Sequence, residues 1–184
     1  MIEFKNVSLS YEEKRIIKNF NATFPDSGTV LITGRSGEGK TTLARLMLGL
    51  VKPDAGELNT EALKFAVVFQ EDRLVPSLTA LENVELVSSK EEARKRLCQM
   101  KLEDSFEKYP SELSGGMKRR VALARALAYD GDVLLLDEAF TGIDDPLAKE
   151  LIGEICEEYK DKLIIAVTHR PELFSKINHK IISI

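Results

Sequence analysis

The sequence lacks several features that mark other classes of protein. Its longest apolar runs, residues 133–136 and 163–167, are far shorter than the ~20 apolar residues that a membrane-spanning helix needs. The first residues contain no basic segment followed by an apolar one, so no signal peptide is expected. No repeat of solenoid period is visible either. The sequence therefore predicts neither a membrane span nor a solenoid.

Cysteine and excess positive charge are also scarce. The two cysteines, Cys98 and Cys156, lie far apart, so neither a disulfide framework nor a zinc site is expected, and a reducing compartment fits. The chain has 26 Lys and Arg against 30 Asp and Glu, a net charge of −4. A protein that holds nucleic acid by bulk electrostatics is expected to be basic, so we expect no nucleic-acid partner.

Short apolar runs alternate with helical patterns along the chain, which predicts an α/β fold. Residues 2–9 and 16–24 have strand-like patterns. Further strands are predicted in a parallel sheet at residues 29–33, 65–69, 133–136 and 163–167, the last three buried on both faces, and a last β-like stretch lies at residues 180–184. Helices are predicted over residues 40–50 and 145–159.

The middle of the chain has a different character. Residues 77–128 contain no convincing strand and are expected to be all-helical. Ala93, Leu97 and Met100 mark one amphipathic helix. We therefore predict a helical insertion into an α/β core.

Residues 34–41, GRSGEGKT, match the spacing GxxxxGK[ST] between an apolar strand and a helical pattern. Glycines allow backbone N–H groups to point inward at phosphate oxygens, and the helix that begins near Lys40 directs its positive dipole end to the same place. Lys40 then reaches the β- and γ-phosphates, and Thr41 coordinates Mg²⁺. A glycine turn with a solvated lysine is the alternative. We expect Glu38, an acid within this loop, to point its side chain outward.

The apolar residues 133–136 lead directly into Asp137 and Glu138. This order places a carboxylate at the carboxyl edge of a parallel sheet, where Asp137 can hold Mg²⁺ directly or through water. Glu138 can polarise an attacking water as a general base. Two acids at the exit of a buried strand are common by themselves, so this interpretation depends on the phosphate loop.

Residues 113–117, LSGGM, precede a helical pattern that begins with the basic run 118–120. Two glycines at a helix start offer a second place where backbone N–H groups meet an anion. Ser114 adds a hydroxyl donor and can cap the helix. A capped helix start with a basic surface face is the alternative.

Together these motifs resemble those of the ATP-binding-cassette (ABC) ATPases. The resemblance runs from about residue 2 to the C-terminus and rests on an ordered set: GRSGEGKT, Gln70, LSGGM, LLLDE, TGID and His169. It implies a P-loop NTPase (RecA-like) fold with a mostly parallel core, an N-terminal antiparallel β-subdomain and an inserted helical subdomain. Residues 1–70 and 114–184 are then the β-subdomain and nucleotide-binding core, and residues 71–113 the helical insertion.

The resemblance also implies roles for single residues. Tyr11 stacks on adenine, although by itself it reads as an ordinary strand aromatic. Gln70 contacts Mg²⁺ and the attacking water and senses the γ-phosphate, which His169 also contacts. The LSGGM signature binds the γ-phosphate of the nucleotide held by the opposite subunit, and Asp144 runs along the dimer interface. The signature ends in Met117 where Gln is usual, which leaves the Ser-Gly-Gly backbone intact.

These roles define four sets of site residues. The nucleotide-binding set is Tyr11, Gly34, Arg35, Ser36, Gly37, Glu38, Gly39, Lys40, Thr41 and Thr42. The signature set is Ser114, Gly115, Gly116 and Met117. The catalytic set is Lys40, Gln70, Glu138 and His169, and the metal set is Thr41, Gln70 and Asp137.

The function that the resemblance implies is the ATP-binding and ATP-hydrolysing subunit of an ABC transporter, with ATP and Mg²⁺ as cofactors. ATP would close a homodimer or heterodimer of cassettes and drive transport by separate transmembrane permease subunits, with a solute-binding protein as a further candidate partner. This places the chain in the cytoplasm, peripheral on the cytoplasmic face of the cell membrane. Residues 71–76 and 78–84 are similar to the corresponding stretch in importers of small solutes, such as nitrate, sulfonates and taurine. A soluble ABC ATPase, for example in iron–sulfur assembly, is the alternative.

Overall fold

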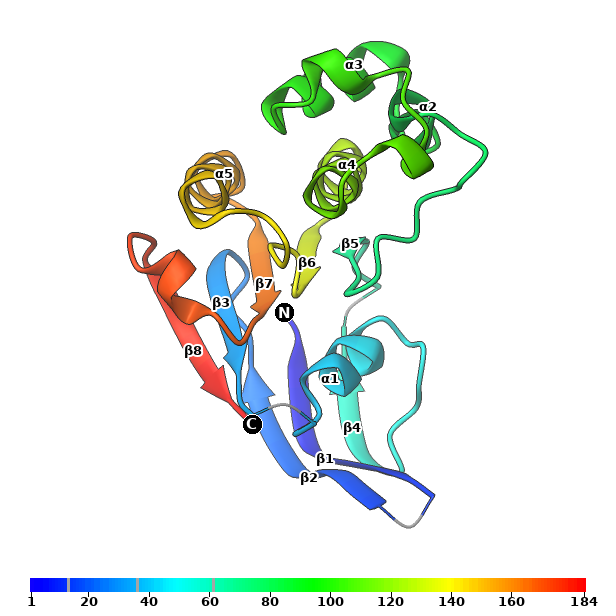
Figure 1. Ribbon diagram of the computed structural model, residues 1–184. Helices are drawn as coiled ribbons and strands as arrows, with labels where there is room; N and C mark the ends of the chain where they lie inside the picture. Colours follow the sequence, from blue (N-terminus) through cyan, green and yellow to red (C-terminus); the bar gives the residue numbers. More distant parts are fainter. Residues whose placement is uncertain (13, 36, 61) are drawn as a thin grey trace.

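The computed structural model describes residues 1–12, 14–35, 37–60 and 62–184, and its elements are labelled in Figure 1. The strands are β1 (Glu3–Tyr11), β2 (Lys14–Thr23), β3 (Gly28–Thr33), β4 (Ala55–Asn59), β5 (Phe65–Val68), β6 (Val133–Asp137), β7 (Leu163–Val167) and β8 (His179–Ser183). The helices are α1 (Lys40–Met47), α2 (Ala80–Glu85), α3 (Lys90–Gln99), α4 (Gly115–Ala128) and α5 (Asp145–Glu158). Three short 3₁₀ turns, η1 (Glu103–Ser105), η2 (Pro110–Glu112) and η3 (Pro171–Phe174), complete the described elements. Within these ranges, no helix combines the length and apolar character that crossing a bilayer requires.

A parallel sheet in the order β5-β6-β7-β3-β8 forms the centre of the molecule. Every residue of β6 and β7 is buried, as their continuous apolar runs predict. Along β6, Leu134 and Leu136 pack into one core while Val133 and Leu135 pack into the other. The parallel sheet therefore separates two hydrophobic cores, because successive side chains of a strand point to opposite faces.

The prediction that residues 65–69 are buried on both faces is wrong. β5 is the edge strand of the parallel sheet, where β6 is its one neighbour among the described strands. Phe65 and Val67 are only half-buried, whereas Ala66 and Val68 are buried. An apolar run alone does not distinguish a central strand from an edge strand, since that difference depends on strand order.

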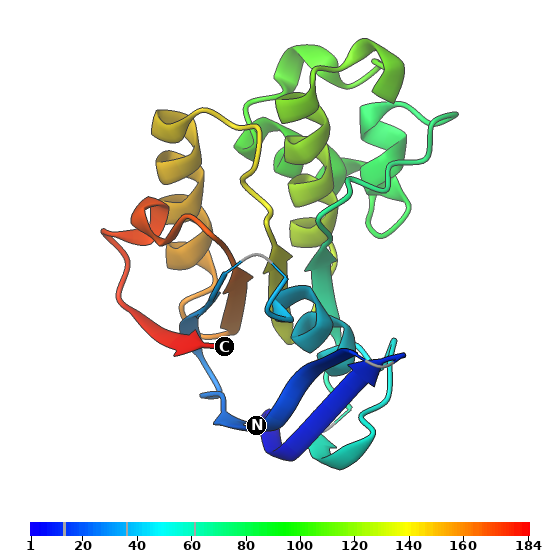
Figure 2. The ribbon, with the colours of Figure 1, turned by 60° about the horizontal axis from the view of Figure 1, so that its bottom comes forward.

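Different layers cover the two faces of the parallel sheet. Helices α4 and α5 lie on one face, and α1 with the antiparallel sheet β2-β1-β4 lies on the other (Figures 1 and 2). The helix predicted over residues 40–50 ends earlier, at Met47, and Gly49 beyond it has a left-handed φ of 65°. This early end is typical of a helix that glycine terminates.

Strand β4 was not predicted from the sequence. Its sequence, AGELN, contains one large apolar residue, Leu58, and follows the turn at residues 52–54. β4 exists because its backbone pairs with β1, Phe4 opposite Leu58 and Glu3 opposite Asn59. Leu58 also packs against the core that contains Phe4. Such pairing between distant segments leaves little signal in a short polar sequence.

The middle of the chain is helical, as predicted. Thr79 caps α2 by accepting from the Glu82 N–H, and the Glu82 carboxylate accepts from the Thr79 N–H in return. The fully buried Asn83 donates to the carbonyls of Val75, Leu78 and Thr79 and so holds the turn before α2. Helices α2 and α3 pack against each other and against α4.

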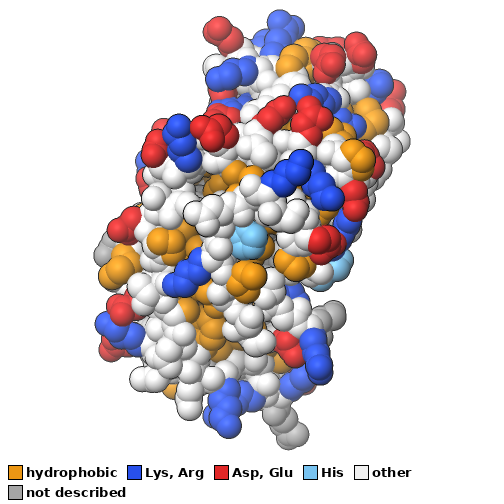
Figure 3. Space-filling view, turned by 90° about the vertical axis from the view of Figure 1, so that its left-hand side faces the viewer, with side chains coloured by type: hydrophobic (Ala, Val, Ile, Leu, Met, Phe, Trp, Pro, Cys, Tyr) orange, Lys and Arg blue, Asp and Glu red, His pale blue; other side chains and the backbone are white. Residues whose placement is uncertain are grey.

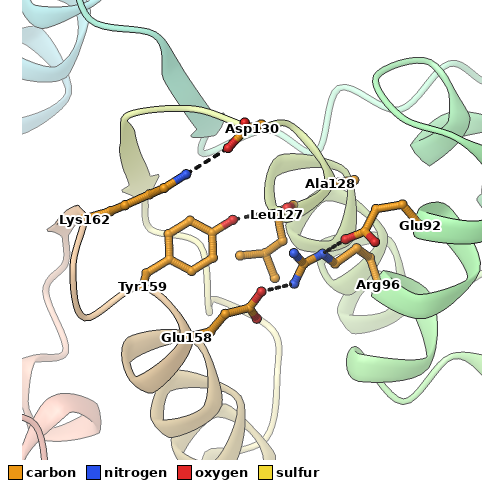
Figure 4. A pocket seen from close by; sticks show the side chains of 8 residues that line it. All are labelled: Glu92, Arg96, Leu127, Ala128, Asp130, Glu158, Tyr159 and Lys162. Atoms are coloured by element: carbon orange, nitrogen blue, oxygen red, sulfur yellow. Dashed lines mark hydrogen bonds and ion pairs between the residues drawn. The ribbon is translucent and has the colours of Figure 1, made fainter.

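Ion pairs join α3 to the end of α5. The Arg96 guanidinium lies between Glu92, 2.6 Å away, and Glu158, 2.5 Å away (Figure 4). These groups border a cavity of about 340 Å³ beside the C-terminal ends of α4 and α5. Tyr159 and Lys162 line it too, and they bond to the Leu127 carbonyl and to Asp130 respectively. Most charged groups that line the cavity are paired, and the bond from Arg96 to Glu158 holds α3 to α5.

Candidate nucleotide-binding site

The loop between β3 and α1 has the geometry of a phosphate cradle. Gly39 precedes α1 with a left-handed φ of 105°, and a Cβ there would lie 2.7 Å from Cδ1 of Ile17. Only glycine fits both constraints. The Lys40 ammonium, nearly buried, donates to the carbonyls of Gly34 at 2.8 Å and Arg35 at 2.9 Å. It therefore lies beneath the loop, where it can exchange carbonyl partners for phosphate oxygens. Ser36, assigned to this loop from the sequence, lies outside the described residues.

The expectation that Glu38 points outward is wrong. Its Oε2 accepts a hydrogen bond of 2.5 Å from the Arg35 N–H, within the same loop. The side chain folds inward because a loop rich in free N–H groups is itself an anion site, and the nearest carboxylate occupies it. Glu38 thus occupies one of the amides of the predicted phosphate loop.

We predict that Glu38→Ala binds ATP about tenfold more tightly than the wild type, since it frees a charge-assisted donor worth roughly 1.5 kcal/mol. It also removes a negative charge from beside the phosphates. Titration calorimetry with ATP measures the change. Glu57→Ala, which removes an exposed acid from β4, is the matched control and should leave affinity unchanged. Unchanged or weaker binding by Glu38→Ala would show that this carboxylate does not compete with phosphate.

Two oxygen-bearing side chains, Thr41 and Asp137, meet at the carboxyl end of β6. The Thr41 hydroxyl donates to Oδ1 of Asp137 at 3.4 Å, and Asp137 is 3% exposed. Burial raises the pKa of the Asp137 carboxyl above its ordinary value. Among the described residues, no group of three or more His, Cys, Asp or Glu could hold a metal by itself. A hydroxyl and a single buried carboxylate fit Mg²⁺, which takes few protein ligands and completes its shell with phosphates and water.

The next residue, Glu138, is joined to the end of β7. Its Oε2 lies 2.8 Å from Nδ1 of His169, and its Oε1 accepts from the His169 N–H at 3.1 Å. Glu138 has a left-handed φ of 51°, an uncommon backbone for a residue with a side chain. This turn directs Glu138 away from the strand axis, so the carboxylate and the imidazole form one unit at the carboxyl edge of the sheet.

Two adjoining cavities bring together residues of the nucleotide-binding and catalytic sets. The first, about 290 Å³, is lined by Tyr11, Ile16, Gly37, Gly39, Lys40, Thr41, Thr42, Gln70, Glu138 and Val167. The second, about 500 Å³, is lined by Lys40, Gln70, Arg119, Glu138, Thr141 and His169. Tyr11 remains 41% exposed. The phosphate loop, Gln70, Glu138 and His169, taken from four separate stretches of sequence, therefore share one site.

The signature residues and Asp144 are not part of that site. Within the described chain, Ser114, Gly115, Gly116, Met117 and Asp144 line neither cavity. Ser114 caps α4 by accepting from the Met117 N–H, and Asp144 caps α5. A Cβ on Gly116 would lie 2.6 Å from the Gly142 carbonyl, so glycine is required where the signature meets the TGID loop. Gly116 and Gly142 are therefore neighbours, and neither lines a cavity, whereas Thr141 of the same loop lines the second one.

Sequence reasoning missed four residues that line the cavities: Ile16 and Val167, which lie in predicted strands, and Thr141 and Arg119. Arg119 is 8% exposed, so the basic run 118–120 is not simply a surface face. Thr141 follows Glu138 by three residues within an assigned motif. Nothing in the sequence marks Arg119, because basic residues near a helix start are usually solvated.

Known proteins match this chain over nearly its whole length. The sequence profile of a family described as ABC transporter matches residues 17–141. The thiamine import ATP-binding protein ThiQ of Haemophilus influenzae is 36% identical over 205 residues, covering 99% of this chain and 94% of that protein. The chain belongs to the ABC transporter family. The glutamine transport ATP-binding protein GlnQ of Escherichia coli is 34% identical, covering 100% of this chain and 87% of that protein.

A solved structure supports the same assignment. A dimeric ATP-binding cassette in a post-hydrolysis state, bound to ADP and Pi, matches with a TM-score of 0.86 and 31% identity. The match covers 100% of this chain and 94% of that one. This ABC subunit therefore has the P-loop NTPase fold, binds ATP and hydrolyses it, as the motifs predict.

Proposed function

We propose that this ABC ATPase drives the import of a small solute, as one of two cassettes that close on ATP beneath separate transmembrane permease subunits. The observation that carries the proposal is the near full-length similarity to an import ATP-binding protein. Site geometry agrees with ATP hydrolysis as the energy source, because the phosphate loop, Glu138 and Gln70 meet in one place.

We infer a dimer because the signature residues of one chain lie outside that chain's own nucleotide site. Ser114 and the signature glycines offer helix-start N–H groups at a surface, away from the Lys40 loop. A second cassette placed head-to-tail would bring these donors to the γ-phosphate that Lys40 holds, and Asp144 would then lie along the interface. Homodimers and heterodimers both satisfy this geometry.

Hydrolysis proceeds by in-line attack of water on the γ-phosphate. Lys40 and the amides of residues 34–42 stabilise the charge on the transferring group, and Tyr11 stacks on adenine. Thr41, Asp137 and Gln70 would hold Mg²⁺, which would supply further charge neutralisation beside the phosphates. Burial favours the neutral form of Asp137, so a cation bound there also restores the carboxylate.

Glu138 orients the attacking water and accepts its proton. His169 holds this carboxylate through two hydrogen bonds and lies near the position of the γ-phosphate. Gln70 lines both cavities and contacts the same water. Such catalysis depends mostly on positioning, so loss of any of these contacts lowers the rate more than the affinity.

The permease docks beside Gln70, in our proposal, on the helical segment formed by residues 71–113. Leu86 is 55% exposed and Val87 is 39% exposed, at the end of α2. The Arg73 guanidinium lies 4.0 Å from the Phe69 ring centre, which adds an apolar and cationic contact surface near the site. Docking there places the chain on the cytoplasmic face of the membrane. The described side chains on the β8 side mix both charge signs (Figure 3), a pattern unlike a basic nucleic-acid face.

A pull-down from the native membrane fraction tests the proposal, with mass spectrometry of the proteins that co-purify with the tagged chain. We expect a polytopic membrane protein at about equal stoichiometry, and a solute-binding protein beside it would narrow the cargo. Leu86→Glu should reduce recovery of the membrane protein without changing ATP binding. Recovery of soluble partners alone would favour the alternative, a soluble ABC ATPase such as one serving iron–sulfur assembly.

A further inference from the structure

Arg119 of α4 binds the segment that contains Gln70. Its Nη1 donates to the Phe69 carbonyl at 2.7 Å, and its Nη2 donates to the Gln70 carbonyl at 2.5 Å. Its Nε forms an ion pair of 3.2 Å with Oδ1 of Asp72. One guanidinium therefore spans the segment that leaves β5.

A second arginine of α4 continues this contact. Arg125 donates from Nη2 to the Asp72 carbonyl at 3.1 Å and from Nη1 to the Arg73 carbonyl at 3.0 Å. Residues 69–79 form no helix or strand, so these carbonyls have no ladder partners. We call the contact of Arg119 and Arg125 with residues 69–73 the arginine clamp.

Because Arg119 is buried, few other side chains could take its place in the arginine clamp. Arg119 is 8% exposed, and a buried guanidinium is stable only when its donors and its charge are satisfied. Asp72 supplies the balancing charge. A guanidinium can bind two carbonyls and a carboxylate in one plane, which an ammonium cannot do. Because all these partners belong to residues 69–72, we expect Arg119 to act through the segment it holds rather than on the nucleotide.

The held segment leads directly into the catalytic site. Gln70 and Arg119 line the same cavity as Lys40 and Glu138. Gln70 itself is exposed, so packing alone does not fix its backbone. The bond from Arg119 to the Gln70 carbonyl fixes the peptide plane, and hence the origin of the Gln70 side chain.

Helix α4 connects the arginine clamp to the signature residue Ser114. Arg119 lies five residues beyond Ser114, about 7.5 Å along the axis of the same helix. An α-helix transmits such a displacement nearly rigidly. Movement of the Ser114 end therefore shifts the guanidinium and, through it, the Gln70 backbone.

We propose that Arg119 is a positioning residue for Gln70, which makes the placement of the γ-phosphate contact depend on the position of α4. This inference rests on the proposed function, in which Gln70 contacts the attacking water. When α4 moves, Gln70 moves with it, and hydrolysis follows the position of the signature helix.

The test measures ATP hydrolysis by Arg119→Gln in the full chain. We expect kcat to fall by about 100-fold, the effect of misplacing a positioned group by about 1 Å. KM for ATP should change far less, because no contact between Arg119 and the nucleotide is lost. Arg119→Lys should give an intermediate kcat, since its ammonium reaches one carbonyl. If Arg119→Gln does not fold, Arg119→Lys takes its place throughout.

A double-mutant cycle with Gln70→Ala separates positioning from general stability. If Arg119 acts through Gln70, Arg119→Gln lowers kcat in the wild type and has little effect in the Gln70→Ala background. Equal losses in both backgrounds, or a wild-type kcat for Arg119→Gln, would overturn the inference while leaving the proposed role of Gln70 standing. A wild-type kcat for Gln70→Ala would instead remove that proposed role, and this inference with it.

Arg120→Gln is the matched control, with the same chemical change at the next position of α4. Its guanidinium donates to the carbonyls of Met100 and Lys101, at the end of α3. We expect its kcat to stay close to the wild type. A fall in kcat as large as that of Arg119→Gln would show that any disturbance of α4 has this effect, and it would contradict a specific link to Gln70.

Discussion

Glu138→Gln is expected to lower the rate of ATP hydrolysis by about 1,000-fold, the middle of the range for a general base. The amide is close in shape to the carboxylate and can still accept from the His169 N–H, so the site keeps its geometry. It cannot accept the proton of the attacking water. ATP affinity should remain unchanged, and size-exclusion chromatography with ATP should show a trapped dimer. Phosphate release measured under excess ATP gives the rate.

The matched control is Glu172→Gln, which neutralises an exposed acid near the same strand end. Glu172 pairs with Arg170 and lines neither nucleotide cavity. Its hydrolysis rate should equal that of the wild type. Wild-type hydrolysis by Glu138→Gln would show that another group serves as the base.

Lys40→Ala should instead weaken ATP binding itself, by about 100-fold in Kd, the equivalent of roughly 2.8 kcal/mol from charged hydrogen bonds. The ammonium is the one positive side chain that both cavities share among the described residues. It also donates to the carbonyls of Gly34 and Arg35, so its loss leaves the free loop less ordered. Calorimetric titration with ATP measures Kd, and thermal melting checks the fold.

Lys162→Ala is the comparison variant for this experiment, because it removes a lysine that bonds to Asp130 far from the loop. Its ATP affinity should not change. An unchanged Kd for Lys40→Ala would contradict the role assigned to the loop. Glu138→Gln and Lys40→Ala should also differ in assembly, since Glu138→Gln traps the ATP dimer and Lys40→Ala prevents it from forming.

Local motifs predicted the core of the site. GRSGEGKT predicts a strand, a phosphate loop and a helix, because its glycines and Lys40 carry their geometry within eight residues. Asp137 and Glu138 directly follow an apolar run, so the run predicts a strand that ends at the two acids. In each case the residues that determine the geometry are neighbours in the chain, so a short stretch of sequence is sufficient.

The features that the sequence did not predict correctly have a different origin. Strand β4 depends on pairing with β1, and the half-burial of β5 depends on its place at the sheet edge. Glu38 turns inward because the Arg35 N–H faces it once the loop has closed. These outcomes depend on which groups meet after folding, a property that composition and spacing do not contain.

The sequence by itself determined the α/β class, the ATP site and the family of this protein, because the motif glycines, Lys40 and the acid pair act within local stretches. Only the tertiary structure decided that Arg119 is buried against residues 69–72 rather than solvated. About fifty positions separate these groups, as between Arg119 and Phe69. A charged side chain finds such a partner only when α4 packs beside the end of β5, since the free energy of burying it depends on the carbonyls and the carboxylate that the fold supplies.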